Sequence, residues 1–369
     1  MFRYTVFYTQ RWCPRNCAYC LAKEVRGSKL LRPEEWERFF SWADKEGFVF
    51  HLGLGNENLA YPWIVDFVRN MRGRYYSLYT TFPEPFYSRT REKLIEAGIY
   101  SLATGVDFDP KWLVDEKGKF DSIKAKAFHG VQAMMWFISK GMPDAHFTVT
   151  VHKYNYEYLD KILDALTETG VPIAVNIVEY SEDGKHDFFG TRDVLKDFLW
   201  NTEEEKKKFR EKMKEIADGV REGKWNVQQP PEYFEWLAKI GGEVGGKCFV
   251  RHRPQILAIE EDGTLRLCGY RKGEEVSKYT IFDLVEGNIT LEELEKIWRK
   301  DWAKCPGCNW SWWWSIEFYM DKLGDESSVY QKHNHVYYKG KRGLDRERAK
   351  EWIKKYGNKI WGANWYMEV

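Results

Sequence analysis

Strand-like and helix-like segments alternate along the first half of the chain. The strand-like segments are short runs rich in β-branched and aromatic residues, at Tyr4–Thr9, Phe48–Gly55, Tyr75–Thr81, Tyr100–Val106, His146–His152 and Ile173–Tyr180. Amphipathic stretches lie between them, at Pro33–Glu46, Tyr61–Arg72, Thr90–Ala97, Ile123–Lys140 and Tyr156–Thr169. Repeats of this kind form parallel sheets with right-handed crossovers. The pattern predicts an α/β fold, a partial (β/α)6 barrel of the TIM type, in which the loops after the strands carry the chemistry.

The alternation ends near Tyr180, and the remaining chain changes in character. Glu203–Glu222 is a highly charged helical segment that suits a linker between domains. The region beyond it is rich in glycine, contains four cysteines and has a hairpin signal around Gly263. We therefore expect a barrel, a helical linker, a small α+β domain and a basic, aromatic C-terminal extension, at residues 1–185, 186–240, 241–320 and 321–369.

The net charge and the N-terminal segment indicate which partners and which cellular compartment to expect. The chain has 57 basic and 56 acidic residues, so its net charge of +1 gives no overall attraction to nucleic acid or membranes. The first residues alternate like a strand and lack the features of a signal peptide, and no apolar run is long enough to span a bilayer. We therefore expect a cytoplasmic protein. The seven cysteines are an odd number, and cytosolic cysteines are more often ligands or catalysts than disulfides.

Three cysteines follow the first predicted strand at a spacing of C-x3-C-x2-C, namely Cys13, Cys17 and Cys20. Three thiolates leave one iron of a [4Fe–4S] cube without a protein ligand, and that open iron can bind and reduce a substrate. A zinc site with a fourth ligand elsewhere is the alternative, although zinc motifs more often consist of two-cysteine pairs. A cluster of cysteines without any ligand is a further alternative.

This spacing, on the loop after the first barrel strand, resembles the signature of the radical S-adenosylmethionine superfamily. The resemblance implies a catalytic [4Fe–4S] cluster on Cys13, Cys17 and Cys20, with S-adenosylmethionine bound to the open iron. It further implies that Tyr19 lies against the adenine of the cofactor. In similar proteins a Gly-Gly-Glu-Pro motif holds the methionine amino group, and here Gly55-Asn56-Glu57-Asn58 stands in its place with two substitutions.

Further cofactor contacts follow from the same resemblance at the ends of later strands. The residues concerned are Thr80, Thr81, Thr104, Asp107 and Asn155. Threonine, aspartate and asparagine at strand ends also serve routinely as turn and cap residues, so each of these side chains has a structural alternative.

The other four cysteines form a second group, made of Cys248, Cys268, Cys305 and Cys308. Fourteen residues separate Cys248 from Gly263, and four more precede Cys268, which resembles the C-x9–15-G-x4-C pattern of SPASM and twitch domains. No cysteine follows Cys308, which favours a twitch-like domain with a single auxiliary [4Fe–4S] cluster. Four thiolates saturate such a cluster, which then transfers electrons. A structural zinc site is the alternative.

The resemblance implies an oxidoreductase or related enzyme that functionalises C–H bonds. Reductive cleavage of S-adenosylmethionine, driven by an external donor such as ferredoxin or flavodoxin, would give a 5′-deoxyadenosyl radical that takes a hydrogen atom from the substrate. The favoured reaction is oxidation or crosslinking of a peptide or protein. The alternatives are oxidation or rearrangement of a small molecule (a sugar, nucleotide or cofactor precursor), modification of nucleic acid through the basic C-terminal extension, and a non-enzymatic module structured by zinc.

Overall fold

The computed structural model describes residues 3–14, 29–48, 50–54, 57–106, 122–181, 183, 191–248, 256–309 and 343–361. Its strands form one open sheet in the order β6-β5-β4-β3-β2-β1-β7-β8. The bounds of the strands are β1 Tyr4–Tyr8, β2 Phe50–Leu54, β3 Tyr76–Tyr79, β4 Ser101–Gly105, β5 Asp144–Val151, β6 Ile173–Ile177, β7 Ile256–Ile259 and β8 Leu265–Arg266. Strands β1 to β6 are parallel and lie in chain order, as a partial barrel requires.

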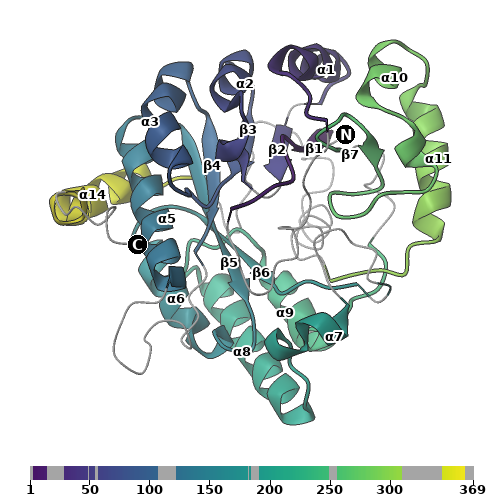
Figure 1. The fold of residues 1–369 in the computed structure, drawn as a ribbon. Coiled ribbons are helices and arrows are strands. Elements are labelled where there is room, and N and C mark those ends of the chain that lie inside the picture. The colour runs from purple at the N-terminus through teal and green to yellow at the C-terminus, as the bar shows by residue number, and fades with distance from the viewer. Residues whose placement is uncertain are drawn as a thin grey trace.

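The helices that connect these strands lie along one side of the sheet (Figure 1). They are α1 Pro33–Lys45, α2 Ile64–Asn70, α3 Phe86–Ala97, α5 Ser122–Ser139 and α6 Leu159–Thr167. Right-handed crossovers between strands that follow one direction place every helix on the same side. In α1 the aromatic residues Trp36, Phe39 and Phe40 recur at helical spacing and are fully buried against the sheet. The predicted α/β fold with a partial barrel is confirmed.

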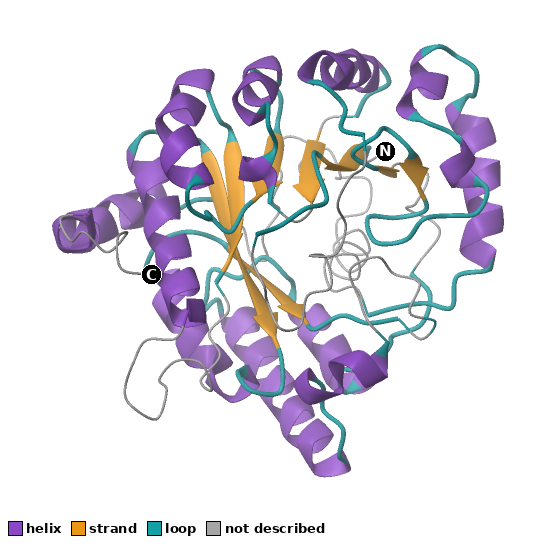
Figure 2. Cartoon of the chain, viewed as in Figure 1, coloured by secondary structure: helices purple, strands orange, loops and turns teal. Residues whose placement is uncertain are grey.

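The two faces of the sheet differ in what covers them (Figure 2). On the helical side, Phe7, Leu78 and Phe147 belong to a large core shared with the connecting helices. On the other side, Tyr4 and Val6 of β1 belong to a small separate cluster with residues of β2 and β7. Three of the seven cysteines, Cys248, Cys268 and Cys308, pack against this small cluster. These three cysteines therefore lie on the face of the sheet that has no connecting helices, whereas Cys305 packs against the large core.

The hairpin predicted around Gly263 is formed by β7 and β8, which pair antiparallel. Gly263 has φ +90°, a conformation that favours glycine in the turn. Strand β7 also pairs in parallel with β1, Tyr4 opposite Ile256 and Phe7 opposite Ile259. Strands β7 and β8, which come from the segment predicted to form a small domain at residues 241–320, therefore belong to the sheet of the barrel. This continuity joins the segment that carries Cys268 to the strand that precedes Cys13.

The remaining helices complete the outer layer. They are α7 Arg192–Leu195, α8 Glu203–Glu222, α9 Pro231–Ile240, α10 Ile281–Val285, α11 Leu291–Ala303 and α14 Arg346–Trp361. Helix α8 has the bounds expected from the sequence, because Thr202 and Glu205 form a capping box at its start. None of the described helices combines the length and apolar character needed to cross a membrane.

Helix α14, from the basic C-terminal extension, lies outside α5 (Figure 1). Its Arg346 donates to the carbonyls of Met142 and Pro143, which precede β5. Arg348 donates to the carbonyl of Thr167 at the end of α6, 3.3 Å away. Two of the basic side chains considered for nucleic-acid contact are thus engaged in attaching the helix to the barrel. They lie at the end of the barrel opposite to the carboxyl ends of the strands.

Candidate active site

Glu57 is the centre of a hydrogen-bonded group at the carboxyl ends of β2 and β3. Its side chain is fully buried and accepts four hydrogen bonds. Oε1 accepts from the Thr80 hydroxyl at 2.6 Å and from the Leu59 N–H at 3.1 Å, and Oε2 accepts from the N–H and hydroxyl of Thr81 at 2.8 and 2.9 Å. The structure therefore brings Glu57, Thr80 and Thr81 together. This is expected for residues at the carboxyl ends of neighbouring parallel strands.

Burial raises the pKa of the Glu57 carboxyl above its ordinary value, because desolvation disfavours the charged form. The hydrogen bonds from Thr80, Thr81 and Leu59 act in the opposite direction and offset part of that rise. The carboxylate oxygens face donors of the protein itself, so they hold the ends of two strands in place. The direct contact with cofactor that the resemblance implies for these three residues stays a prediction.

Asn58 joins the ends of three strands. Its Oδ1 accepts from the Thr9 hydroxyl at 2.7 Å, and its Nδ2 donates to the carbonyl of Tyr79 at 2.6 Å and to that of Gly53 at 3.4 Å. The Gln10 side chain donates to the backbone carbonyl of Glu57. The loop that begins after β1 is thereby fixed to β2 and β3 just before it reaches Cys13.

We expect Asn58→Ala to lower the free energy of unfolding by about 2–3 kcal/mol, because it removes the acceptor of the buried Thr9 hydroxyl and a donor to the Tyr79 carbonyl. Urea unfolding measures this effect. Asn201→Ala is the matched control, since Asn201 also donates to two backbone carbonyls but is exposed. Equal losses from the two variants would contradict a special role for Asn58.

The other predicted cofactor contacts lie in different surroundings. Thr104 is fully buried on the side of β4 that faces α5. Gly130 of α5 packs so closely here that a Cβ added to it would lie 3.3 Å from the Thr104 hydroxyl. Asn155 forms a closed turn after β5, accepting from the N–H of His152 at 2.8 Å and donating to the carbonyl of Thr150 at 2.9 Å. The remaining predicted residues lie outside the described part of the chain: Cys17, Tyr19, Cys20, Gly55, Asn56 and Asp107.

The second cysteine group assembles from three separate segments. Cys248 follows α9, Cys268 follows β8, and Cys305 and Cys308 follow α11. Cys308 donates its N–H to the carbonyl of Gly246 at 3.2 Å, which places the segment of Cys248 beside the CxxC turn. Gly307 has φ +105°, and a Cβ there would lie 2.4 Å from the Gly246 oxygen, so the turn requires glycine.

The CxxC turn and the Cys268 turn also connect the two edges of the open sheet. Cys308 forms a β-bridge with Ser181, beyond the end of β6. The adjacent Asn309 accepts from the Tyr180 N–H at 2.9 Å and donates to the Val178 carbonyl at 3.2 Å. Arg271, which follows β8 at the other edge, forms a bidentate ion pair with Asp183, which follows β6, at 2.8 and 3.1 Å. The cysteine group therefore spans the opening between β6 and β8.

The charges of Cys268 and Arg271 act on the Cys305 thiol. Burial raises the pKa of the Cys305 thiol, and the negative charge of a Cys268 thiolate raises it further. The N–H of Gly307 and the positive charge of Arg271 act against this rise. A bound metal would favour the thiolate form of both cysteines.

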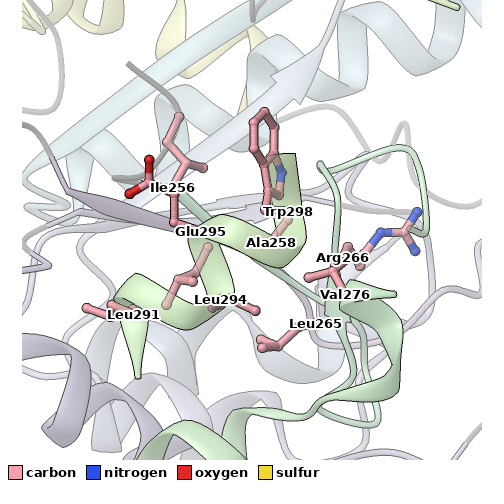
Figure 3. A pocket seen from close by; sticks show the side chains of 10 residues that line it. Ile256, Ala258, Leu265, Arg266, Val276, Leu291, Leu294, Glu295 and Trp298 are labelled. Atoms are coloured by element: carbon pink, nitrogen blue, oxygen red, sulfur yellow. The ribbon is translucent and has the colours of Figure 1, made fainter. Parts of the chain in front are cut away.

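Helix α11 supports the Cys268 hairpin from outside. Trp298 donates its indole N–H to the carbonyl of Leu267 at 2.6 Å, directly before Cys268. Figure 3 shows Ile256, Leu294 and Trp298 around a small cavity between the hairpin and α11. Its volume is ≈ 30 Å³, about that of one water molecule. The cavity is thus a packing gap and too small for a substrate.

The donor set of the second cysteine group fits an iron–sulfur cluster. Its four members, Cys248, Cys268, Cys305 and Cys308, are all partly accessible side chains. Within the described ranges, no three His, Cys, Asp or Glu side chains converge closely enough to hold a single metal ion. Each thiolate of a cube binds a different iron, so the four sulfurs need not converge on one point. For the first group, only Cys13 lies within the described residues.

A set of ion pairs that the sequence patterns did not predict lies between the two cysteine groups. Arg11, two residues before Cys13, donates to the Glu260 carboxylate at 3.0 Å, and Arg266 donates to the same oxygen. Arginine after one strand and glutamate after another are common, and 249 positions separate Arg11 from Glu260. The pairing of β7 with β1 is the signal that places them together, and this pairing is visible only in the fold.

No protein-family model matches the chain, and no curated protein matches it either. Solved structures do match. Streptococcus suis SuiB bound to the precursor peptide SuiA has a TM-score of 0.54 and 15% identity, covering 80% of this chain and 64% of SuiB. SuiB bound to S-adenosylmethionine has a TM-score of 0.50 and 12% identity, covering 72% of this chain and 59% of SuiB. The chain thus spans about three fifths of the length of SuiB.

A further match extends over nearly the whole chain. Native anSMEcpe with bound AdoMet and Cp18Cys peptide has a TM-score of 0.52 and 14% identity, covering 97% of this chain and 98% of the other. SuiB and anSMEcpe have both been solved with S-adenosylmethionine bound. At these identities the likeness establishes a shared fold. The resemblance inferred from the cysteine spacing is confirmed at that level.

Proposed function

We propose that this chain is a radical S-adenosylmethionine enzyme that oxidises or crosslinks a peptide or protein substrate. The observation that carries the proposal is the placement of Cys13, Cys17 and Cys20 after β1, on a fold shared with proteins solved with S-adenosylmethionine and peptides. Three thiolates match a cube with one open iron. The group on these cysteines, when bound, supplies the electron that cleaves S-adenosylmethionine reductively.

The residues of the chain have the task of keeping the cofactor site in one arrangement. Glu57 and Asn58 hold the ends of the first three strands together, so the loop that carries Cys13 begins from a rigid part of the sheet. The second cysteine group lies over the gap between β6 and β8, where it limits the access of water. Exclusion of water protects a radical reaction from side reactions.

Cys248, Cys268, Cys305 and Cys308 would hold the auxiliary [4Fe–4S] cluster, whose chemistry is electron transfer. A peptide is favoured over a small molecule because two of the similar structures contain peptides. Nucleic acid is not favoured, because Arg346 and Arg348 bind backbone carbonyls of the barrel.

Anaerobic reconstitution tests this proposal. We expect about eight irons per chain with matching sulfide, as two cubes require. With dithionite as reductant, the protein should convert S-adenosylmethionine to 5′-deoxyadenosine, and a peptide encoded by a neighbouring gene should become oxidised or crosslinked. Deuterium from the labelled peptide should appear in the 5′-deoxyadenosine. Zinc in place of iron, or an intact cofactor after reduction, would contradict the proposal.

A further inference from the structure

A buried ionic group lies between the ends of β1 and β7. The Glu260 carboxylate accepts from Arg11 at 3.0 Å and from Arg266 through the same oxygen, Oε1. The side chains of Arg11, Glu260 and Arg266 are 7%, 4% and 0% exposed. Lys272 approaches the same oxygen at 3.7 Å, but its side chain is 57% exposed. Charges buried in this way interact far more strongly with their surroundings than charges in water do.

This ionic group is attached directly to the turn that carries Cys268. Arg266 donates its Nε–H to the carbonyl of Cys268 at 3.1 Å. Tyr8, the last residue of β1, donates its hydroxyl to the carbonyl of Gly269. The Arg266 guanidinium lies over the Tyr8 ring at 5.5 Å from its centroid. A fully buried cation is therefore held beside the backbone of one cysteine, and one carboxylate holds that cation.

We propose that Arg266 and Glu260 are positioning residues that set the reduction potential of the iron–sulfur group on Cys268 and its three partner cysteines. This inference rests on the proposed function for the identity of that group. Reduction adds one negative charge to the group. A buried guanidinium stabilises the added charge, whereas a buried carboxylate destabilises it. Removal of Arg266 and removal of Glu260 must therefore shift the potential in opposite directions.

The potential is measured in the Cys13→Ala/Cys17→Ala/Cys20→Ala background, which retains only the second cysteine group. Dithionite supplies electrons in the titration, and the electron paramagnetic resonance signal reports the reduced fraction. We expect Glu260→Gln to raise the ratio of reduced to oxidised cluster at a fixed potential about tenfold, or about 59 mV for one electron. Arg266→Met should lower that ratio by a similar factor.

Three further variants separate charge from structure. Arg266→Lys keeps the charge and should restore most of the potential lost in Arg266→Met. Arg11→Met removes the other cation that donates to Glu260 and should shift the potential in the same direction as Arg266→Met. Lys272→Met removes a solvent-screened cation near the same carboxylate, and the potential should hardly change.

The outcomes distinguish this inference from the proposed function. A background protein without iron, or with zinc, would show that the auxiliary cluster itself is wrongly assigned. Iron with an unchanged potential in both Glu260→Gln and Arg266→Met, or shifts of the same sign, would overturn the inference alone. If Arg266→Met does not fold, Glu260→Gln and Arg11→Met still require shifts of opposite sign.

Discussion

Replacing Cys13, Cys17 and Cys20 together by alanine will abolish the formation of 5′-deoxyadenosine and remove one of two clusters. The iron content should fall from about eight to about four per chain. The second cysteine group is built on other segments, after α9, β8 and α11, so its cluster should survive. Iron analysis and a chromatographic assay for 5′-deoxyadenosine, both under anaerobic conditions, measure the two effects.

The control for that experiment is Cys305→Ala/Cys308→Ala. This variant removes two ligands of the second group and leaves the loop after β1 unchanged. It should lose the other cluster and retain cleavage of S-adenosylmethionine, while oxidation of the substrate stops. If the triple variant still produced 5′-deoxyadenosine, the catalytic cluster would have to lie elsewhere.

The strands and connecting helices could be predicted from the sequence because their pattern is local. In α1 the positions of Trp36, Phe39 and Phe40 define one buried face, and this face alone distinguishes a helix from a strand. Both ends of helix α8 match the prediction, and Thr202 and Glu205 form the capping box that starts it. The pairing of β7 with β1 could not be predicted, since nothing local to Ile256–Ile259 specifies a partner some 250 residues earlier.

The candidate site divides in the same way. Cysteine spacing predicts the ligands, because few other chemistries need thiols at such intervals. The polar residues at strand ends could be located, but their partners could not. The sequence predicts cofactor contacts for Glu57, Thr80 and Thr81, and the structure adds that both threonines donate to the Glu57 carboxylate. Asn155 likewise bonds within its own turn. Spacing along a strand does not reveal whether a side chain meets a ligand or a neighbour.

Replacing Glu57 by alanine is expected to lower the free energy of unfolding by about 3–5 kcal/mol, because four buried donors lose their acceptor. Glu57→Gln keeps one acceptor oxygen and should cost about 1–2 kcal/mol. Urea unfolding gives both values. Because internal donors occupy the carboxylate, the folded Gln variant should bind S-adenosylmethionine nearly as tightly as the original protein. Binding weakened about tenfold in that variant would instead indicate a direct contact with the cofactor.

The pH dependence of stability tests the same carboxyl independently. Its pKa in the folded protein lies above the ordinary value of 4.5, chiefly because of burial. The folded state therefore binds this proton more tightly than the unfolded state does, and the resulting stabilisation is complete below pH 4.5. It is lost as the pH rises through the folded pKa.

Glu57→Gln cannot titrate, so its unfolding free energy lacks this component. The free energy of the original protein minus that of the variant should consequently fall as the pH rises above 4.5. A difference that rises over this range would mean that the four hydrogen bonds outweigh desolvation, and that Glu57 is held as a carboxylate.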